Sequence, residues 1–380
     1  MNKEWKIKKL GDVLTVQNGY AFDSKKFVTG EGIPLVRIRD LKSGVKTVVN
    51  FAGNYDKKYE VHKGDLLIGM DGEFNCYNWK GEVALLNQRV CRLQEFSSSI
   101  SSQFLFYGIN KHLKDIEDVT GYATVKHISS GQIKNIRFAL PPLPEQTRIV
   151  KILDETFAAI DKAKANAEKN LQNSRELFDS YLNKVFAPSA SSGQRNPGED
   201  WEEKKLGECF KLKSGDGLTS KNMSREGNIP VYGGNGIAGS HNEYNLSGSN
   251  VIVGRVGALC GNARHINENI WLTDNAFKVI NFKYEFDNSF LTYLLNYKNL
   301  KSYARQAAQP VISNSSLQDV KLYFPHFINE QKQIVKKLDG ISSESKKLEA
   351  IYQQKLSDLE ELKKSILQKA FDGELTIENE

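Results

Sequence analysis

The sequence has few of the residues on which covalent cross-links and metal sites depend. Its 380 residues include four cysteines and six histidines, and no two cysteines form a C-x-x-C pair. Scattered cysteines of this kind are typical of a protein kept in a reducing compartment. A zinc site from Cys260, His265 and His241 is a weaker alternative to ordinary buried or exposed side chains at these positions.

Long hydrophobic runs are missing as well. No segment approaches the roughly 20 apolar residues that cross a bilayer, and the first residues, MNKEWK, contain no apolar signal-peptide core. The composition, 39% hydrophobic and 26% charged, is that of an ordinary globular protein. We therefore expect a cytoplasmic protein with no membrane contact and with enough residues for two domains.

The usual catalytic motifs are absent too. The sequence has no Walker lysine motif, no H-E-x-x-H and no Asn-Pro-Pro-Tyr, and its acidic residues form no cluster typical of nuclease metals. Gly234–Gly239 matches G-x-G-x-x-G, but the residues behind it, 240–248, read as a loop where a dinucleotide site needs a helix. A dinucleotide site is therefore the weaker interpretation, and we expect no catalysis and no cofactor in this chain.

The sequence does contain a long internal repeat. Pro141-Pro142-Leu143-Pro144-Glu145-Gln146 has a counterpart 185 residues later that ends in Glu330-Gln331, and the match continues without a gap to Phe186 and Phe371. A self-match of this length indicates duplication. The second copy lacks the double proline, since Phe327-Ile328-Asn329 stands there.

Each copy predicts a long helix. Apolar residues recur at steps of three, four or seven from Ile149 to Val185 and again from Ile334 to Ile366, with Lys164 as the one polar residue in the first series. Pro144 suits a first helical turn, and Asn329 can cap the second helix. Apolar stripes of this length need partners, so we expect the two helices to pair as an antiparallel coiled coil.

The segments before the helices form a second, weaker repeat. Trp201, Lys204-Lys205-Leu206-Gly207 and Ile229-Pro230 follow their counterparts by 196 residues, and Gly254 and Gly257 follow Gly69 and Gly72 by 185. Short apolar runs between glycines, such as Ile33–Arg39, Gly64–Gly69 and Arg89–Leu93, predict strands, and Ser102–His112 predicts a helix. We expect an α+β fold with mostly antiparallel sheets, divided into globular domain 1–140, helix 141–187, linker 188–200, globular domain 201–324, helix 325–372 and tail 373–380.

Most of the net charge of +6 falls in the two globular segments, which is a mild indication of a polyanionic partner. Their glycine-rich loops contain basic, amide and imidazole side chains of the kinds that contact base edges or phosphates. For any single residue a solvated charge or a structural hydrogen bond is the commoner explanation, so the prediction concerns the set. The candidate DNA-binding residues are Arg37, Arg39, Gln88, Arg89, Lys126, His127, Arg255, Arg264, His265, Arg305, Gln306 and Gln309.

The whole chain resembles the specificity subunits of type I restriction-modification systems. The resemblance lies in Leu140–Gln146, in the C-terminal phrase Gln368–Leu375, and in the landmarks 232–239, 254–257 and 273–276. It implies a subunit without catalytic activity, in which each globular domain reads one half of a split DNA target. The paired helices would set the gap and hold two modification subunits, which methylate adenine with S-adenosylmethionine, and restriction subunits would join them.

Two alternatives are compatible with the residues alone. A free-standing DNA-binding regulator with two recognition domains would share the architecture but would bind DNA tightly without partner subunits. An enzyme with an unfamiliar site would act on DNA as a purified chain.

Overall fold

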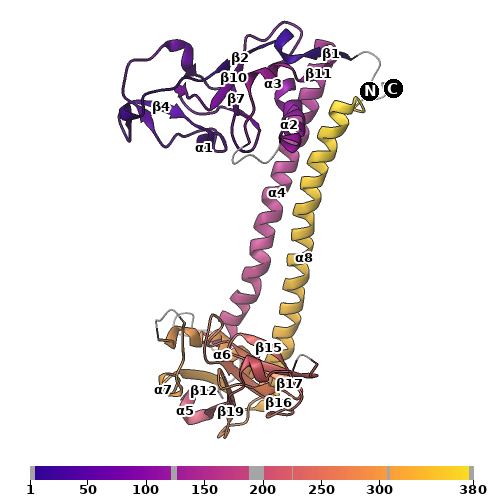
Figure 1. The fold of residues 1–380 in the computed structure, drawn as a ribbon. Helices are drawn as coiled ribbons and strands as arrows, with labels where there is room; N and C mark the ends of the chain where they lie inside the picture. The colour runs from indigo at the N-terminus through magenta and orange to yellow at the C-terminus, as the bar shows by residue number, and fades with distance from the viewer. Residues whose placement is uncertain (1–4, 121–125, 188–200, 225, 306–308, 376–380) are drawn as a thin grey trace, which may run out of the picture. The chain divides into compact units, whose positions relative to one another are not determined.

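The structure is a computed structural model that describes residues 5–120, 126–187, 201–224, 226–305 and 309–375. They form two compact units (Figure 1): the first is Met1–Asn166 with Lys355–Glu380, and the second is Ala167–Gln354. Each unit thus contains one globular region and parts of both long helices. The predicted linker, the last five residues of the predicted tail and the candidate Gln306 lie outside the described residues.

The globular part of unit 1 is built from short strands and two main helical segments. Its sheets have the orders β1-β11, β2-β10-β7-β8 and β3-β5-β4-β9-β6, and every pairing is antiparallel except β4 with β9. The elements are β1 (Lys6–Lys9), β2 (Thr15–Asn18), β3 (Phe27–Val28), β4 (Ile33–Val36), α1 (Ile38–Leu41), β5 (Asn50–Phe51), β6 (Glu60–Val61), β7 (Leu66–Gly69), β8 (Cys76–Asn78), β9 (Ala84–Leu86), β10 (Val90–Gln94), α2 (Ser102–Val119), α3 (Ser130–Lys134) and β11 (Arg137–Leu140).

Unit 2 repeats this arrangement with a different set of outer strands. Its sheets have the orders β12-β20, β13-β19-β16-β17 and β15-β14-β18, and the one parallel pairing is β14 with β18. The elements are β12 (Trp201–Lys205), α5 (Leu206–Cys209), β13 (Lys211–Ser214), β14 (Ile229–Gly233), β15 (Gly236–His241), β16 (Ser249–Gly254), β17 (Ala263–Asn267), β18 (Trp271–Leu272), β19 (Ala276–Ile280), α6 (Asn288–Tyr297), α7 (Asn314–Leu317) and β20 (Lys321–Pro325).

The predicted α+β class with mostly antiparallel sheets is confirmed, with local corrections. The helix expected over Ser102–His112 continues to Val119. The run Ile33–Arg39 is a strand only as far as Val36, because the buried Asp40 carboxylate accepts a hydrogen bond from the Arg37 N–H and starts the short helix α1. Asp40 therefore overrides the strand pattern at Arg37 and Arg39.

The two predicted long helices are α4 (Leu143–Phe186) and α8 (Ile328–Asp372). In unit 1 they pair antiparallel, since Lys164 contacts Glu360 while Lys363 lies 3.1 Å from Asp161. In unit 2 the Ser345 hydroxyl donates to the Ser174 carbonyl, and both side chains are buried. Lys164, the one polar residue in the apolar series of the first helix, is thus paired with a carboxylate.

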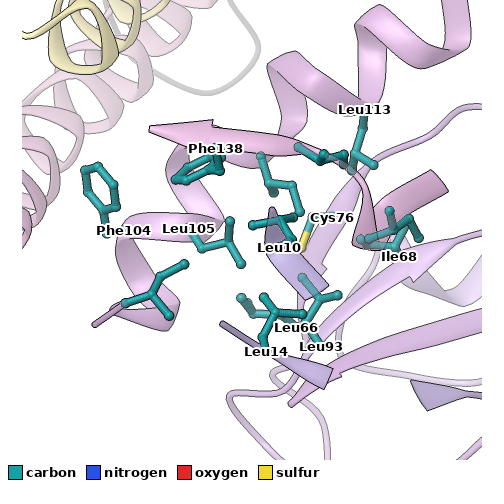
Figure 2. Close-up of a cluster of buried hydrophobic side chains, with 14 of the residues drawn as sticks. Leu10, Leu14, Leu66, Ile68, Cys76, Leu93, Phe104, Leu105, Leu113 and Phe138 are labelled. Carbon is teal, nitrogen blue, oxygen red and sulfur yellow. The ribbon is translucent and has the colours of Figure 1, made fainter. Parts of the chain in front are cut away.

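The last aromatic residue of each long helix packs into the core of the other repeat. Phe371, near the end of α8, packs on Phe104 of α2, with ring centroids 4.9 Å apart. Figure 2 shows Phe104 and Phe138 in this core of unit 1. Phe186, at the end of α4, packs on Phe290 of α6 in the core of unit 2, with ring centroids 5.6 Å apart. The matched phenylalanines of the sequence repeat therefore have equivalent structural roles.

The repeated Glu-Gln pair places a buried amide at the start of each long helix. Gln146 donates to the Pro141 and Ser99 carbonyls and accepts from the Ser101 N–H, at 2.8 to 2.9 Å. Gln331 makes the same three contacts with Pro325, Glu285 and Asp287, at 2.9 to 3.0 Å. These amides connect the helix start to the residues that precede α2 and α6. Among the described residues, no helix is long and apolar enough to cross a membrane.

Candidate nucleic-acid interface

Three segments that are distant in the sequence meet beyond the end of β7 in unit 1. The Met70 N–H donates to the Arg89 carbonyl, the Ile128 N–H donates to the Met70 carbonyl, and the Gly72 N–H donates to the Lys126 carbonyl, at 2.9 to 3.0 Å. We call this arrangement, residues 70–72, 89 and 126–128, the junction of unit 1. It brings the candidate residues Arg89, Lys126 and His127 together.

The side chains of this junction carry a small ionic network. The Asp71 carboxylate lies 2.9 Å from Nη1 of Arg89 and 2.7 Å from Nδ1 of His127. The Asp71 side chain is 19% exposed, whereas those of Arg89 and His127 are 58% and 50% exposed. Asp71 therefore holds two basic side chains at the surface. Gln88, the next candidate, is exposed beside Arg89.

Lys126 makes contacts within unit 1. Its Nζ donates to the Glu117 carbonyl at 2.9 Å and lies 3.8 Å from the Glu117 carboxylate. Lys114 and the Phe74 N–H, which both bond to that carboxylate, lower the pKa of Glu117 and keep it charged at neutral pH. Lys126 thus anchors its segment to the end of α2.

Unit 2 builds the same backbone junction. The Arg255 N–H donates to the Asn275 carbonyl, the Ile312 N–H donates to the Arg255 carbonyl, and the Gly257 N–H donates to the Pro310 carbonyl, at 2.9 to 3.0 Å. Residues 255–257, 275 and 310–312 form the junction of unit 2. The backbone bridge between Asp71 and His127 is matched by one between Val256 and Val311.

Arg255 is the charged side chain of this second junction. Its Nη1 donates to the Asp274 carbonyl at 3.2 Å, and its guanidinium carbon lies 5.6 Å from the centre of the Phe277 ring. Its Nε is buried and has no hydrogen-bond partner in the part of the chain that the structure describes. The Asp274 carbonyl and the Phe277 ring therefore orient the guanidinium, while its Nε–H lacks a hydrogen-bond acceptor within the described residues.

A cavity of about 740 Å³ lies beside the junction of unit 2. Its walls include Val256, Gln309 and the residues Gly233–Ala238 and Thr273–Asn275. The glycine motif in this wall is the tight hairpin between β14 and β15, not a strand followed by a helix. This geometry rules out the dinucleotide interpretation. The expected loop 240–248 is shorter at its start, because β15 continues to His241.

The remaining candidates of unit 2 are more dispersed. Arg264 lies in β17, and its Nη1 is buried without a partner within the described ranges. His265 uses both ring nitrogens, which lie 2.8 and 3.0 Å from the hydroxyls of Ser249 and Ser289. Arg305 and Gln309 are exposed, and the Arg305 N–H donates to the Val311 carbonyl.

The metal alternative also fails on geometry. His265 is bonded to two serines, His241 packs on the Trp271 ring, and Cys260 is buried. Within the described ranges, no group of three or more His, Cys, Asp or Glu residues could hold a metal ion. Burial raises the pKa of the Cys91 and Cys209 thiols to about 12, so these thiols stay protonated at neutral pH.

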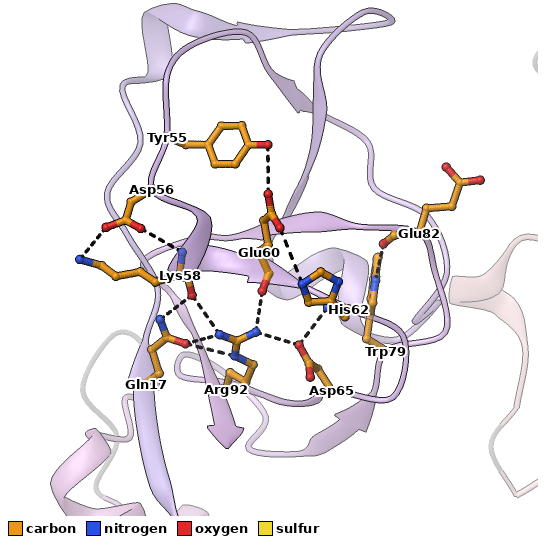
Figure 3. A network of polar contacts seen from close by, with 10 residues as sticks. All are labelled: Gln17, Tyr55, Asp56, Lys58, Glu60, His62, Asp65, Trp79, Glu82 and Arg92. Atoms are coloured by element: carbon orange, nitrogen blue, oxygen red, sulfur yellow. Dashed lines mark hydrogen bonds and ion pairs between the residues drawn. The ribbon is translucent and has the colours of Figure 1, made fainter. Parts of the chain in front are cut away.

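Figure 3 shows a contrasting arginine that the sequence does not single out. Arg92 is only 11% exposed, and its guanidinium binds Asp65 at 2.9 Å, Gln17 at 2.6 Å and the carbonyls of Lys58 and Glu60. It connects β10 to the segment around β6. Arg92 is therefore structural, whereas Arg89, three residues earlier, is exposed and has a single carboxylate partner.

Asp71 is the residue of the junction that the sequence prediction missed. A search for basic, amide and imidazole side chains passes over an acidic residue, so residue type alone gives no signal for Asp71. The position of Asp71 in the repeat does give a signal, because Asp71-Gly72 aligns with Val256-Gly257. Arg37 and Arg39, by contrast, belong to the start of α1, where Arg37 lies 6.0 Å from the Phe27 ring.

Comparison with known proteins agrees with this duplicated arrangement. The model of the type I restriction modification DNA specificity domain matches residues 2–170 and again residues 198–357. The chain belongs to this family. The two matched regions correspond to the two copies of the sequence repeat, so the predicted resemblance is confirmed.

Known specificity subunits of type I restriction enzymes are similar to this chain. The specificity subunit of the type I restriction enzyme EcoBI from Escherichia coli is 33% identical over 54% of this chain, and the match spans 43% of that relative. The EcoprrI specificity subunit, also from Escherichia coli, is 25% identical over 83% of this chain and 82% of its own length. One of these relatives thus matches about half of the chain, and the other matches most of it.

Solved structures support the fold. A chain from a study of complex assembly and conformational transition of the type I R-M system matches with a TM-score of 0.72 at 20% identity, covering 99% of both chains. The HsdS subunit from Thermoanaerobacter tengcongensis matches with a TM-score of 0.62 at 19% identity, covering 99% of this chain and 98% of that one. At these identities the likeness shows a shared fold.

Proposed function

We propose that this chain is the DNA-recognition subunit of a type I restriction-modification complex. Each globular region reads one half of a bipartite double-stranded DNA target. The carrying observation is that both units build the same backbone junction and place different side chains on it. A duplicated frame with divergent surface residues is what reading two different half-sites requires.

The helices take the second role in this proposal. The helices α4 and α8 set the spacing between the half-sites and dock two modification subunits, and restriction subunits join them. Adenine methylation takes place on the modification subunits, which bind S-adenosylmethionine, so this chain carries neither a cofactor nor a catalytic residue. The family match and the absence of a catalytic motif in the sequence support this division of labour.

Segment exchange tests the proposal. Replacing residues 201–324 with the corresponding segment of a relative should change one half of the methylated sequence and leave the other half intact, because base readout is local to each domain. The measurement is methylome sequencing with the full chain and its modification subunit. The matched control replaces residues 1–140, which should change the opposite half.

Three outcomes would contradict the proposal. Alteration of both halves by a single exchange would refute modular readout. Methyl transfer by the purified chain alone would make it an enzyme. Tight, specific DNA binding without partner subunits, and no methylation with them, would favour the free-standing regulator.

A further inference from the structure

The junction of unit 1 holds one carboxylate between two exposed basic side chains. Each oxygen of Asp71 has its own partner, Oδ2 with Arg89 at 2.9 Å and Oδ1 with His127 at 2.7 Å. Arg89 reaches the site from the turn before β10, and His127 from the segment before α3. Asp71 thus fixes the relative position of two groups that are 38 residues apart in the sequence.

This network leaves donor and acceptor groups directed away from Asp71. Arg89 uses one nitrogen of its guanidinium, and its other N–H groups have no partner among the residues that the structure describes. A carboxylate only accepts hydrogen bonds, so Nδ1 of His127 is the donor in this contact, and Nε2 of the ring can accept a hydrogen bond while that nitrogen carries no proton. An arginine fork can bind O6 and N7 of guanine, and an imidazole acceptor can bind the exocyclic amine of cytosine or adenine.

The second unit shows that the fold does not need these charges. Val256, Asn275 and Val311 occupy the places of Asp71, Arg89 and His127 in the same hydrogen-bonded backbone. Two valines and an amide therefore support an equivalent junction. Exposed ion pairs also contribute little stability, typically about 0 to 1 kcal/mol. Structural stabilisation is thus a poor explanation for the network.

We propose that Asp71 is a positioning residue that presents Arg89 and His127 as one base-reading pair for the half-site of unit 1. The ligand is the edge of a base pair, or of two adjacent base pairs, in duplex DNA. At the matched positions of unit 2, Val256, Asn275 and Val311 present an uncharged surface, which suits a different base. This inference rests on the proposed function and assigns the residues that carry it in one unit.

The test is a substitution that keeps the size of the side chain and removes its charge. Asp71→Asn is made in the full chain, and kcat/KM for methylation is measured with the modification subunit on duplexes that carry each base-pair substitution in both half-sites. Discrimination should fall roughly 5- to 150-fold at one or two positions of one half-site, the range of a bidentate contact between a side chain and a base. Arg89→Ala and His127→Ala should relax the same positions, and Asp71→Asn should add little to either.

Two further variants exclude a merely structural effect. Asp71→Val copies the residue that the equivalent backbone of unit 2 accepts, so it should fold and should relax the same positions. Glu73→Gln removes a different exposed ion pair, with Lys42 at 3.1 Å, and should leave recognition unchanged. Hydrogen exchange over residues 66–72 verifies that β7 and the junction remain folded.

The outcomes separate this inference from the proposed function. Unchanged discrimination in Asp71→Asn and Asp71→Val, with specific methylation by the unsubstituted chain, would overturn the inference alone. A uniform loss over all sequences with a shallower salt dependence would also overturn it, since that pattern marks phosphate contacts. If the unsubstituted chain directs no methylation at any bipartite site, the proposed function fails and the inference fails with it.

Discussion

The two units share a backbone frame and differ in the strands that this frame carries. Both contain a two-stranded and a four-stranded sheet of the same strand arrangement. The third sheet of each unit, which we call the outer sheet, includes one parallel pairing, β4 with β9 in unit 1 and β14 with β18 in unit 2. The outer sheet itself has five strands in unit 1 and three in unit 2. The two units therefore differ in the number of strands in the outer sheet and in the side chains of the junctions.

Two of the recurring positions, a glycine and a glutamine, are ones where the backbone or a buried polar group leaves no alternative. Gly19 and Gly215 each lie against a carbonyl oxygen, and Gln146 and Gln331 are fully buried and hydrogen-bonded. Exposed junction positions such as Arg89 and Asn275 carry no such constraint. The comparison teaches that the frame is maintained by a few obligatory contacts, which leaves the exposed residues free to differ.

The largest expected effect comes from removing the buried amides. Gln146→Leu leaves the Ser99 and Pro141 carbonyls and the Ser101 N–H without their partner, and Gln331→Leu does the same in unit 2. Unsatisfied buried groups cost about 1 to 3 kcal/mol each, so the loss of three contacts should lower the local stability of each variant by at least about 3 kcal/mol. Peptide-resolved hydrogen exchange should assign each loss to its own unit.

The matched control is Gln172→Leu. Gln172 lies exposed on α4, where it bonds to Glu176, so its substitution should change stability by less than about 0.5 kcal/mol. A small effect of Gln146→Leu together with a large effect of Gln331→Leu would break the equivalence of the two frames.

The long helices, the repeat and several strands could be predicted from the sequence because their signals are local. Apolar spacing over about nine to ten turns at 3.6 residues per turn predicts α4 and α8. The exact self-match at Glu145-Gln146 and Glu330-Gln331 also marks a repeated structural position. Its physical reason, a buried amide that bonds to three backbone groups, requires the folded chain.

The rest depends on contacts between distant residues. Asp40 starts α1 within an apparent strand, and Asp71 meets Arg89 and His127 only when three segments converge. The sequence predicts DNA binding by His265 and Lys126, and the structure adds that both make hydrogen bonds inside their units, as Arg89 and His127 also do. Residue type cannot separate a structural arginine such as Arg92 from an exposed one such as Arg89, and burial can.

A smaller effect is expected from adding a methyl group at the matched glycines. A Cβ on Gly19 would lie 2.0 Å from the Asn87 carbonyl oxygen, and one on Gly215 would lie 2.1 Å from the Leu272 carbonyl oxygen. Backbone must shift in each case, so Gly19→Ala and Gly215→Ala should each cost about 2 to 3 kcal/mol. The control Gly217→Ala has nothing within 4 Å of its Cβ and should cost far less in urea unfolding. Unequal losses at the two glycines would show that one unit can relax where the other cannot.

The smallest effect concerns the hydroxyl that connects each globular region to its helix. Tyr107 donates to Asp154 in α4, and Tyr293 donates to Asp339 in α8 at 2.6 Å. Tyr107→Phe and Tyr293→Phe should each cost about 1 to 2 kcal/mol at neutral pH, because each leaves a carboxylate without one donor. Tyr297→Phe is the control, since Tyr297 packs on Phe186 and no hydrogen bond of its hydroxyl is found within the described residues.

The pH dependence of this last effect has a defined sign. Burial and the bond to Asp154 raise the pKa of Tyr107 to about 12, above the value of about 10 in an unfolded chain, and burial and the bond to Asp339 raise the pKa of Tyr293. The neutral phenol is therefore favoured by folding, so its contribution is complete below about pH 10 and is lost as the pH rises toward 12. The stability difference between the unsubstituted chain and Tyr107→Phe should shrink across this window, as measured by urea unfolding. A difference that stays constant to pH 12 would mean that the hydroxyl does not bond to Asp154 in solution.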